Sequence, residues 1–307
     1  MNAVDNYLWN SSKSIPLIEL SADKDIISLL EKLSSDEKNI LISEPNNSEI
    51  KIPERLEKEI NSKLIQAPGF LLLRFTSTAD DETLRLLYAL LCRSIGSLNN
   101  RYGYFFDVID QGLDYTKAAV PVSKTKASTG FHTDSTAKGY LPDVVGLLCL
   151  QPGQKGGESQ VTNAADLYKH LQNNFPEALI ELSKPIIRDV ITPGTVNNTD
   201  AILENAFPVF SNEAHKLTFR YMRFWIESAH LKTGIPLNEK LLAGLNAIDH
   251  FFSKEENLIQ FKMNRGELLF LNNRFLCHSR TNFEDAPENN TVRRMVRAWI
   301  NFDFDLI

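Results

Sequence analysis

The feature that most constrains the fold is a series of short apolar or alternating runs between residues 131 and 302, each broken by glycine, proline or polar turn residues. Runs such as DVVGLLCLQ, GELLFLNN and TVRRMVRAWINF are typical of strands. Helical patterns are concentrated near the start of the chain and in insertions. This segregation predicts an α+β fold whose core is an antiparallel barrel or jelly roll.

We expect the 307 residues to form a single domain. Residues 1–67 carry apolar residues at three- and four-residue spacing, which predicts a helical N-terminal elaboration. Residues 68–307 form the expected core. A helical insertion is predicted at about 163–183 and a second insertion, or lid, at about 228–256.

Local signals predict particular elements within this scheme. GFLLLRF at 69–75 suits a buried strand, and the amphipathic segment after it suits a helix that ends near Gly96. Asn163 is placed to cap one inserted helix, and Pro176 to begin the next. The segments PIIRDVIT and KLTFRYMRFWI are both expected to be strands.

Composition narrows the class of partner. The formal net charge of −6 argues against nucleic acid, because phosphate binding relies on clustered lysine and arginine. The chain has no apolar run of the roughly 20 residues that a membrane helix requires, and its start lacks a secretory leader pattern. We therefore expect a cytoplasmic protein that acts on a small molecule, without a nucleic-acid or membrane partner. A homo-oligomer remains open.

Two residues in the segment FHTDS form a candidate metal-binding pair. His132 and Asp134 are two positions apart, so in an extended segment both side chains leave the same face while Thr133 points away. One imidazole and one carboxylate, joined by a distant second imidazole, form the facial triad that binds iron(II) and leaves positions open. Alone, an HxD pair is a weak signal.

The third ligand is sought among the remaining histidines. His278 follows a hydrophobic strand and a polar turn in GELLFLNNRFLCHSRTNF, where a side chain can project into the mouth of a barrel. The other candidates lie in helical or polar surroundings and are interpreted as surface residues: His170, His215, His230 and His250. His278 is therefore the best third ligand.

Five segments in order resemble the clavaminate synthase-like and taurine dioxygenase-like (TauD/TfdA) branch of the iron(II)/2-oxoglutarate oxygenases. They are GFLLLRF with the following helix and SIGSL, FHTDS, LPDVVGLLCLQPGQKGGES, MNRGELLFLNNRFLCHSRTNF and TVRRMVRAW. The resemblance covers roughly residues 68–304. It implies a double-stranded β-helix (jelly-roll) core with flanking helices and insertions, and it implies Fe(2+), 2-oxoglutarate and O2 as cofactor and co-substrates.

The far carboxylate of 2-oxoglutarate needs a cation, and arginine offers a bidentate fork. Arg293 resembles the co-substrate arginine of the family, which follows the distal histidine by about this interval. Arg294 lies on the opposite face if the strand is regular, although a bulge would exchange the two. Ser159, at the end of GGES, occupies the place of a hydroxyl that binds the same carboxylate in the family.

For the prime substrate, the resemblance implies a free amino acid, with lysine or arginine favoured. Arg297 shares the face of Arg293 and could bind the substrate carboxylate. A basic substrate would need carboxylates and an aromatic wall for its cation. Further candidates for these contacts are Arg74, Arg223, Trp225, Glu227, Asp110, Asp107 and Asp114.

The resemblance implies hydroxylation of an unactivated C–H with release of succinate and CO2. Related halogenases carry a small residue in place of the carboxylate, so Asp134 favours hydroxylation or desaturation over halogenation. Three alternatives stay open: a non-catalytic jelly roll that binds a ligand, an oxygenase of the same family acting on a sulfonate or other carboxylic acid, and a desaturase. A hydrolytic zinc site is disfavoured because HExxH is absent.

Overall fold

The computed structural model describes residues 3–9, 14–110, 126–135, 137–189, 198–213, 216–286 and 292–303. The α-helices of this part of the chain are α1 (Lys24–Lys32), α2 (Ser35–Ser43), α3 (Glu54–Ile65), α4 (Asp81–Ile95), α5 (Ala164–Asn174), α6 (Pro176–Leu182), α7 (Thr199–Glu204), α8 (Arg223–Thr233) and α9 (Glu239–Phe252). The strands are β1 (Leu17–Glu19), β2 (Phe70–Arg74), β3 (Gly96–Leu98), β4 (Phe106–Ile109), β5 (Val144–Gln151), β6 (Lys155–Gly156), β7 (Ser159–Asn163), β8 (Ile186–Ile187), β9 (Ala206–Phe207), β10 (Phe210–Glu213), β11 (Lys216–Phe219), β12 (Leu258–Phe261), β13 (Glu267–Asn272), β14 (Leu276–Arg280), β15 (Phe283–Glu284) and β16 (Arg294–Phe302).

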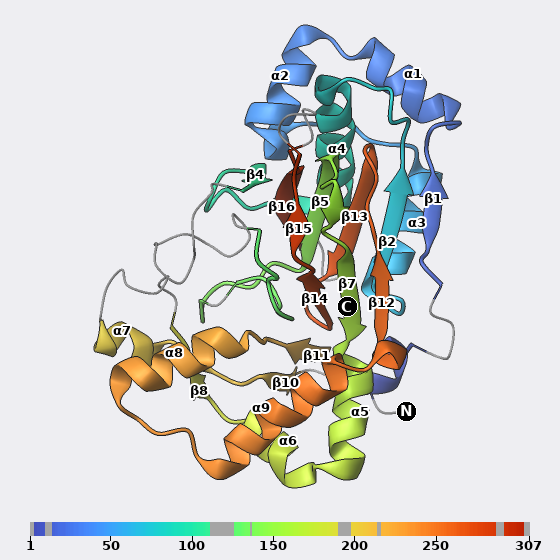
Figure 1. The fold of residues 1–307 in the computed structure, drawn as a ribbon. Coiled ribbons are helices and arrows are strands. Elements are labelled where there is room, and N and C mark those ends of the chain that lie inside the picture. The colour runs from blue at the N-terminus through green and yellow to red at the C-terminus, as the bar shows by residue number, and fades with distance from the viewer. Residues whose placement is uncertain are drawn as a thin grey trace.

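Two sheets position the site. The larger sheet has the order β1-β2-β13-β5-β16-β3, with β4 also paired to β16, and its central strands are antiparallel neighbours. The smaller sheet has the order β12-β7-β14. Helices α1 to α4 lie on one side of the larger sheet, and α5 to α9 form a separate group below the sheets (Figure 1). The mixed helix and sheet architecture agrees with the sequence prediction.

The larger sheet is buried on both faces, which explains its continuous apolar strands. In β13, Leu268 and Phe270 join the hydrophobic cluster beneath α3 and α4, whereas Leu269 and Leu271 join the cluster that reaches the smaller sheet and the lower helices. β2 divides its side chains between the same two clusters. Because alternate residues of a strand point to opposite faces, a strand with two buried faces reads as an unbroken apolar run.

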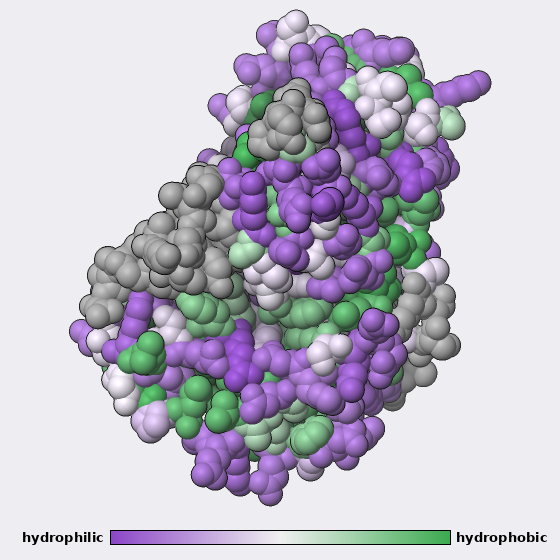
Figure 2. Space-filling model, viewed as in Figure 1, coloured by the Kyte–Doolittle hydropathy of each residue, from purple (hydrophilic) through white to green (hydrophobic). Residues whose placement is uncertain are grey.

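Hydrophilic residues cover most of the outer surface around α1 to α4 in the view of Figure 2. Apolar residues gather across the middle of that view, between the sheets and the helices below them. Within the described residues, no helix is long and apolar enough to cross a membrane.

Several boundaries agree with the local sequence signals. α4 ends at Ile95, and Gly96 follows it as expected. The side chain of Asn163 accepts a hydrogen bond from the Ala165 N–H at 2.7 Å and so caps α5, while Pro176 begins α6. Such caps satisfy amide donors that the first helical turn leaves free.

One segment differs from its prediction. KLTFRYMRFWI was expected to be a single strand, but β11 ends at Phe219 and helix α8 begins at Arg223. No side chain caps the start of α8, so its clearest boundary signal is Gly234, which follows its last residue with a φ of 71°. In PIIRDVIT, Ile186–Ile187 forms a short strand and residues 190–192 lie outside the described part.

Truncating Phe270 tests the burial of the central sheet. Phe270 is 0% exposed and its ring stacks on that of Tyr88 at 5.9 Å. We expect Phe270→Ala to lower the free energy of unfolding by about 3–5 kcal/mol, because it removes buried surface and leaves a cavity. Urea denaturation measures the change. The control Ile180→Ala, at a side chain that is 60% exposed, should stay within about 0.5 kcal/mol of the wild type.

Candidate metal centre

Backbone hydrogen bonds bring the first and last candidate ligands together. The His132 N–H donates to the His278 carbonyl at 2.9 Å, and the His278 N–H donates to the His132 carbonyl at the same distance. The segment around His132 forms only isolated bridges, to His278 and to Met222, and not a full strand. These bridges hold two residues that are 146 positions apart in sequence (278 − 132) directly opposite one another.

The neighbouring residues alternate as expected for an extended segment. Thr133 points away from His132, since its N–H donates to the Tyr221 carbonyl at 2.9 Å and its hydroxyl accepts from the Tyr221 N–H at 3.0 Å. The fully buried Asn273 binds both backbone polar groups of Asp134: its amide oxygen accepts from the Asp134 N–H at 2.7 Å, and its amide nitrogen donates to the Asp134 carbonyl at 3.0 Å. Asn273 therefore fixes the backbone of Asp134.

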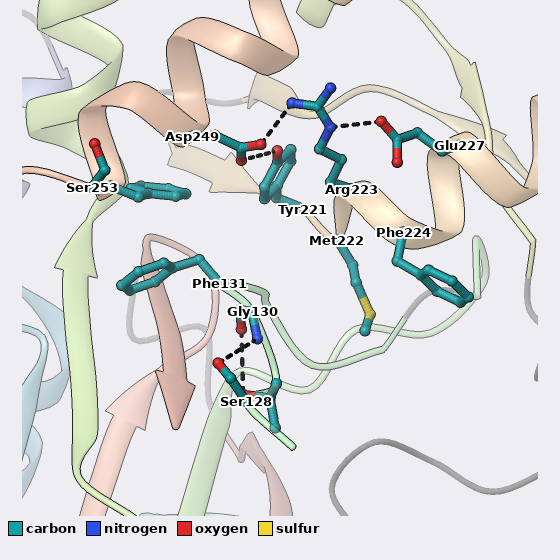
Figure 3. Close-up of a pocket in the computed structure, with 12 residues that line it drawn as sticks. Ser128, Gly130, Phe131, Tyr221, Met222, Arg223, Phe224, Glu227, Asp249 and Ser253 are labelled. Atoms are coloured by element: carbon teal, nitrogen blue, oxygen red, sulfur yellow. Dashed lines mark hydrogen bonds and ion pairs between the residues drawn. The ribbon is translucent and has the colours of Figure 1, made fainter. Parts of the chain in front are cut away.

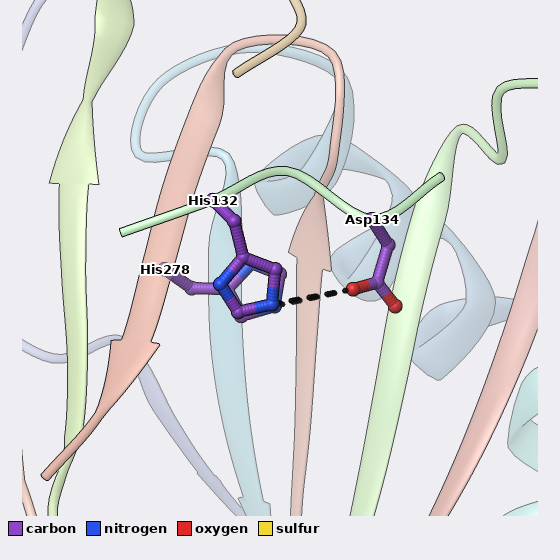
Figure 4. A group of neighbouring side chains, drawn as sticks. All are labelled: His132, Asp134 and His278. Atoms are coloured by element: carbon purple, nitrogen blue, oxygen red, sulfur yellow. Dashed lines mark ion pairs between the residues drawn. The ribbon is translucent and has the colours of Figure 1, made fainter. Parts of the chain in front are cut away.

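His132, Asp134 and His278 converge, and their potential ligand atoms all lie within 4.8 Å of one another. Figure 4 shows both imidazole rings on the same side of the carboxylate. Asp134 Oδ1 is 3.6 Å from His132 Nε2 and 3.6 Å from His278 Nε2. Two imidazole nitrogens and one carboxylate oxygen form the donor set of the facial triad that is typical of non-haem iron(II).

The hydrogen bond of His132 selects the form that binds a metal. Its Nδ1 lies 2.9 Å from the Gly130 carbonyl, which can only accept, so Nδ1 carries the proton and Nε2 presents a lone pair toward Asp134. Burial and the neighbouring His278 lower the pKa of His132 to about 4. The imidazole is therefore neutral near pH 7, as a metal ligand must be.

The second oxygen of Asp134 has its own partners. Asp134 Oδ2 accepts a hydrogen bond from the indole N–H of Trp299 and lies 3.3 Å from Nη1 of Arg297. Burial acts to raise the pKa of Asp134, but Arg297 and the two imidazoles outweigh it and hold this pKa well below its usual range. The carboxylate is therefore ionised and available to a cation.

A cavity surrounds the three residues and mixes aliphatic and cationic side chains. The aliphatic residues lining it are Val108, Val145, Leu147, Val161, Leu269 and Leu271. Its cationic residues are Arg280, Arg293 and Arg297, and Ser159 also lines it. Asp134 is the one carboxylate among the described lining residues. An apolar wall with a few convergent polar groups is typical of a ligand site.

The alternation of β16 determines which arginine faces the cavity. Arg293 and Arg297 line the cavity, whereas Arg294 points away and forms an ion pair with Asp81 at 3.0 Å. The pairing of β16 with β5 shifts register between Arg294 and Met295. That irregularity does not bring Arg294 to the cavity face.

Arg293 is a buried cation whose guanidinium has no hydrogen bond or ion pair with any described residue. It is 7% exposed, and its guanidinium carbon lies 5.2 Å from the centre of the Phe283 ring. Burial lowers its pKa. A buried charge without a partner is costly, so this side chain is suited to an anionic ligand.

The turn before β7 brings Ser159 to the same cavity. Gly156 and Gly157 both have positive φ values, 65° and 72°, and a Cβ on Gly156 would approach the Asn282 carbonyl oxygen to 2.2 Å. Only glycine fits such a turn without strain. Beyond it, Ser159 pairs in register with Arg280 of β14.

Four other candidates do not line the cavity. Arg74 is 44% exposed and forms ion pairs with Glu19 and Glu267, and Asp107 forms one with Arg85 at 2.6 Å. Other residues placed elsewhere are Asp110, which lies 3.6 Å from Lys126, and Trp225, which lies on α8 beside Phe224. Asp114 and His215 lie outside the described residues.

Arg223 and Glu227 line a second hollow, a groove of about 580 Å³. Arg223 binds Glu227 at 2.7 Å and Asp249 at 2.6 Å on one side of this groove, and Phe131 lies opposite (Figure 3). The groove and the metal cavity share Thr129 in their linings. Of the candidate substrate residues, Arg297 alone lines the cavity around His132, Asp134 and His278, and Arg223 and Glu227 line the adjoining groove. The others are not among the described lining residues of either space.

Comparison with known proteins places this geometry in a family. The model of the family described as "Taurine catabolism dioxygenase TauD, TfdA family" matches residues 40–299. The chain belongs to this family. The match begins at residue 40, inside α2, and so extends further toward the start than the expected 68.

Curated relatives of this TauD/TfdA family chain are distant. FR-33289 synthase of Streptomyces rubellomurinus is 26% identical over 183 residues, 59% of this chain and 51% of the relative. Human gamma-butyrobetaine dioxygenase is 24% identical over 204 residues, 66% of this chain and 50% of the relative. The chain spans about half the length of these relatives.

Solved structures share the fold over nearly the whole chain. Asparagine oxygenase in complex with Fe(II), 2S,3S-3-hydroxyasparagine and succinate matches with a TM-score of 0.67 and 16% identity, covering 94% of this chain and 93% of the other. The non-heme iron oxygenase OrfP, in complex with Fe and alpha-ketoglutaric acid, matches with a TM-score of 0.65 and 14% identity, covering 95% of each chain. At identities of 16% and 14%, this structural similarity shows that the TauD/TfdA family chain has the same fold as these proteins.

Two residues of the site were missed from the sequence, Asn273 and Trp299. Asn273 lies in the polar turn before His278, and nothing in the sequence links it to Asp134. Trp299 follows Arg297 by two positions and therefore shares its face, so the alternation of β16 could have identified it.

Removing the carboxylate tests the metal centre. Asp134→Ala should weaken the binding of iron(II) or cobalt(II) by more than the roughly 10–100-fold that loss of an outer-shell partner produces, because a ligand itself is lost. Anaerobic titration calorimetry measures the affinity. Asp107→Ala is the matched control, since Asp107 is a half-exposed carboxylate bound to Arg85. An equal affinity in both variants would contradict the assignment.

Proposed function

We propose that this chain is an iron(II)- and 2-oxoglutarate-dependent oxygenase that hydroxylates an unactivated C–H bond of a small molecule. One observation carries the proposal: two imidazoles and a carboxylate converge in a cavity that is also lined by Arg293, a buried cation whose guanidinium forms no ion pair with the described residues. A metal would bind the imidazoles and the carboxylate, and a dianionic co-substrate would bind Arg293. Family membership supports the same conclusion.

In this proposal the two sheets form the jelly roll that the family resemblance implies. The larger sheet supplies Arg293 just before β16 and Arg297 within it, and the smaller sheet supplies Ser159 from β7 and His278 from β14. Residues from both sheets line the cavity, which therefore lies between them. Rigid strands of this kind hold catalytic groups in a fixed geometry better than loops do.

Each side chain has a defined task. His132, Asp134 and His278 would hold the metal, while Arg293, helped by Ser159, would bind the far carboxylate of 2-oxoglutarate. Bound iron(II), with 2-oxoglutarate and O2, supplies the oxidising chemistry that turns C–H into C–OH and yields succinate and CO2. The aliphatic wall excludes water, and Arg297 orients an anionic group of the substrate.

For the substrate, we propose a free amino acid whose carboxylate binds Arg297. Two solved structures of the same fold have amino-acid derivatives bound, 3-hydroxyasparagine in asparagine oxygenase and (3S)-hydroxy-L-Arg in OrfP. A lysine or arginine side chain needs a carboxylate partner. Asp110 is the best described candidate, because its side chain is 12% exposed and its charge acts on Arg280, which lines the cavity. Burial and Arg293 outweigh that charge and lower the pKa of Arg280 to about 9.

The charge of the cavity favours a second candidate within the same reaction class. Three arginines and one carboxylate are among its described lining residues, and the carboxylate is the expected metal ligand. After 2-oxoglutarate binds Arg293, Arg297 still lines the cavity, next to Asp134. A sulfonate or another carboxylic acid without a positive charge would therefore also fit this cavity.

Replacing each of two neighbouring arginines by leucine, in separate variants, tests the co-substrate site. Arg293→Leu should weaken 2-oxoglutarate binding by roughly 30-fold or more, because truncating one partner of a buried charge pair costs about 2 kcal/mol or more. Calorimetric titration of 2-oxoglutarate into the metal-loaded protein measures the loss. Arg294→Leu, which removes the outward arginine bound to Asp81, should leave this affinity unchanged.

A substrate panel tests the reaction. Purified protein is incubated with iron(II), 2-oxoglutarate, O2 and individual amino acids, sulfonates or carboxylic acids, and succinate and product mass are followed. We expect succinate together with a product heavier by one oxygen atom, with basic amino acids compared directly against anionic substrates. His132→Ala is the control. A desaturase would instead give a product lighter by two hydrogen atoms, and no His132-dependent succinate from any compound would contradict the proposal.

A further inference from the structure

The two oxygens of Asp134 have different surroundings. Oδ1 faces both imidazoles, at 3.6 Å from each Nε2. Oδ2 faces away from them, accepts the indole N–H of Trp299 and lies near Nη1 of Arg297. The carboxylate is therefore oriented by groups on β16, a strand that contributes none of the three candidate metal ligands.

We propose that Trp299 is a positioning residue that commits Oδ2 of Asp134 to a hydrogen bond, so that Oδ1 is the oxygen with which Asp134 would hold the metal. This inference rests on the proposed metal centre and goes beyond it. A carboxylate free to rotate could use both oxygens on one cation and occupy a position that the co-substrates need. Ligating carboxylates are commonly held by such outer hydrogen bonds.

Trp299 is better suited to this task than Arg297. Arg297 lies 3.3 Å from the same oxygen, but it is also the proposed anchor for an anionic substrate and would then divide its charge between two partners. The indole carries a single N–H donor. Its hydrogen bond to Asp134 therefore does not compete with substrate binding.

The surroundings of Trp299 hold its ring in place. The rings of Tyr102 and Tyr140 lie 5.5 Å and 5.6 Å from it, and Arg297 lies 4.9 Å from its centre. These contacts come from the residues following β3, from the loop before β5 and from β16 itself. With the ring packed between them, the N–H is oriented toward Asp134 before any metal arrives.

The decisive comparison is Trp299→Phe against Trp9→Phe. Both substitutions replace an indole by a phenyl ring, and both remove an N–H donor, but Trp9 donates to the Pro68 carbonyl at 2.8 Å whereas Trp299 donates to Asp134. We expect Trp299→Phe to weaken cobalt(II) binding about 10–100-fold and to alter the cobalt absorption spectrum. Trp9→Phe should change neither, and urea denaturation of the metal-free variants reports their stability separately.

A measurement on the wild-type protein tests the inference even if the Trp299→Phe variant does not fold. Wild-type protein labelled with ¹⁵N-tryptophan has three tryptophans and hence three indole N–H groups, which Trp9→Phe and Trp225→Phe assign by difference. Zinc(II) should shift the Trp299 resonance and leave that of Trp9 in place. An unmoved Trp299 resonance would overturn the inference.

The outcomes separate the two proposals. Wild-type protein that binds no divalent metal would defeat the metal centre and, with it, this inference. Wild-type binding together with unchanged affinity and spectrum in Trp299→Phe would defeat the assignment to Trp299 alone, even if that variant were less stable to urea. Weakened binding with an altered spectrum would support it.

Discussion

The site depends on the reciprocal backbone hydrogen bonds between His132 and His278. An extended segment that forms no regular strand is fixed by them against β14, and β14 is fixed in turn against β7. With that register set, alternation alone turns His132 and Asp134 toward the cavity and Thr133 away from it. The arrangement of the candidate ligands thus begins with backbone pairing, and the side chain of Asn273 then fixes the backbone of Asp134.

The cavity carries opposite charges at two places, an ionised carboxylate at Asp134 and a cation at Arg293. Asp134 is ionised because Arg297 and the imidazoles outweigh the cost of its burial, whereas the buried guanidinium of Arg293 forms no ion pair with the described residues. A cation is favoured at one end and an anion at the other. An enzyme that binds a metal and a dicarboxylate next to one another needs this separation, since either ligand alone would leave a buried charge uncompensated.

Strand alternation is a local rule, and it predicted that His132 and Asp134 share one face and that Arg294 points away from Arg293. His278 was selected from its setting after a hydrophobic strand, and Arg293 from the family resemblance. Arg294 does point outward, to Asp81. Trp225 and Glu227 were named because a basic substrate would need an aromatic wall and a carboxylate, but both lie on α8, a helix whose start no side chain caps. Arg74 lies at the end of a well-predicted strand, but its partners Glu19 and Glu267 are distant in sequence. Those partners arise from strand pairing, which a single sequence does not reveal.

The alternation of β16 has an evolutionary consequence. Arg297 and Trp299 share one face of this strand, and the opposite face contributes Val296, Ala298 and Ile300 to the cluster beneath α4. Inserting or deleting one residue within β16 would exchange the two faces at every later position. Related chains should therefore vary in the identity of these side chains far more readily than in the length of the strand.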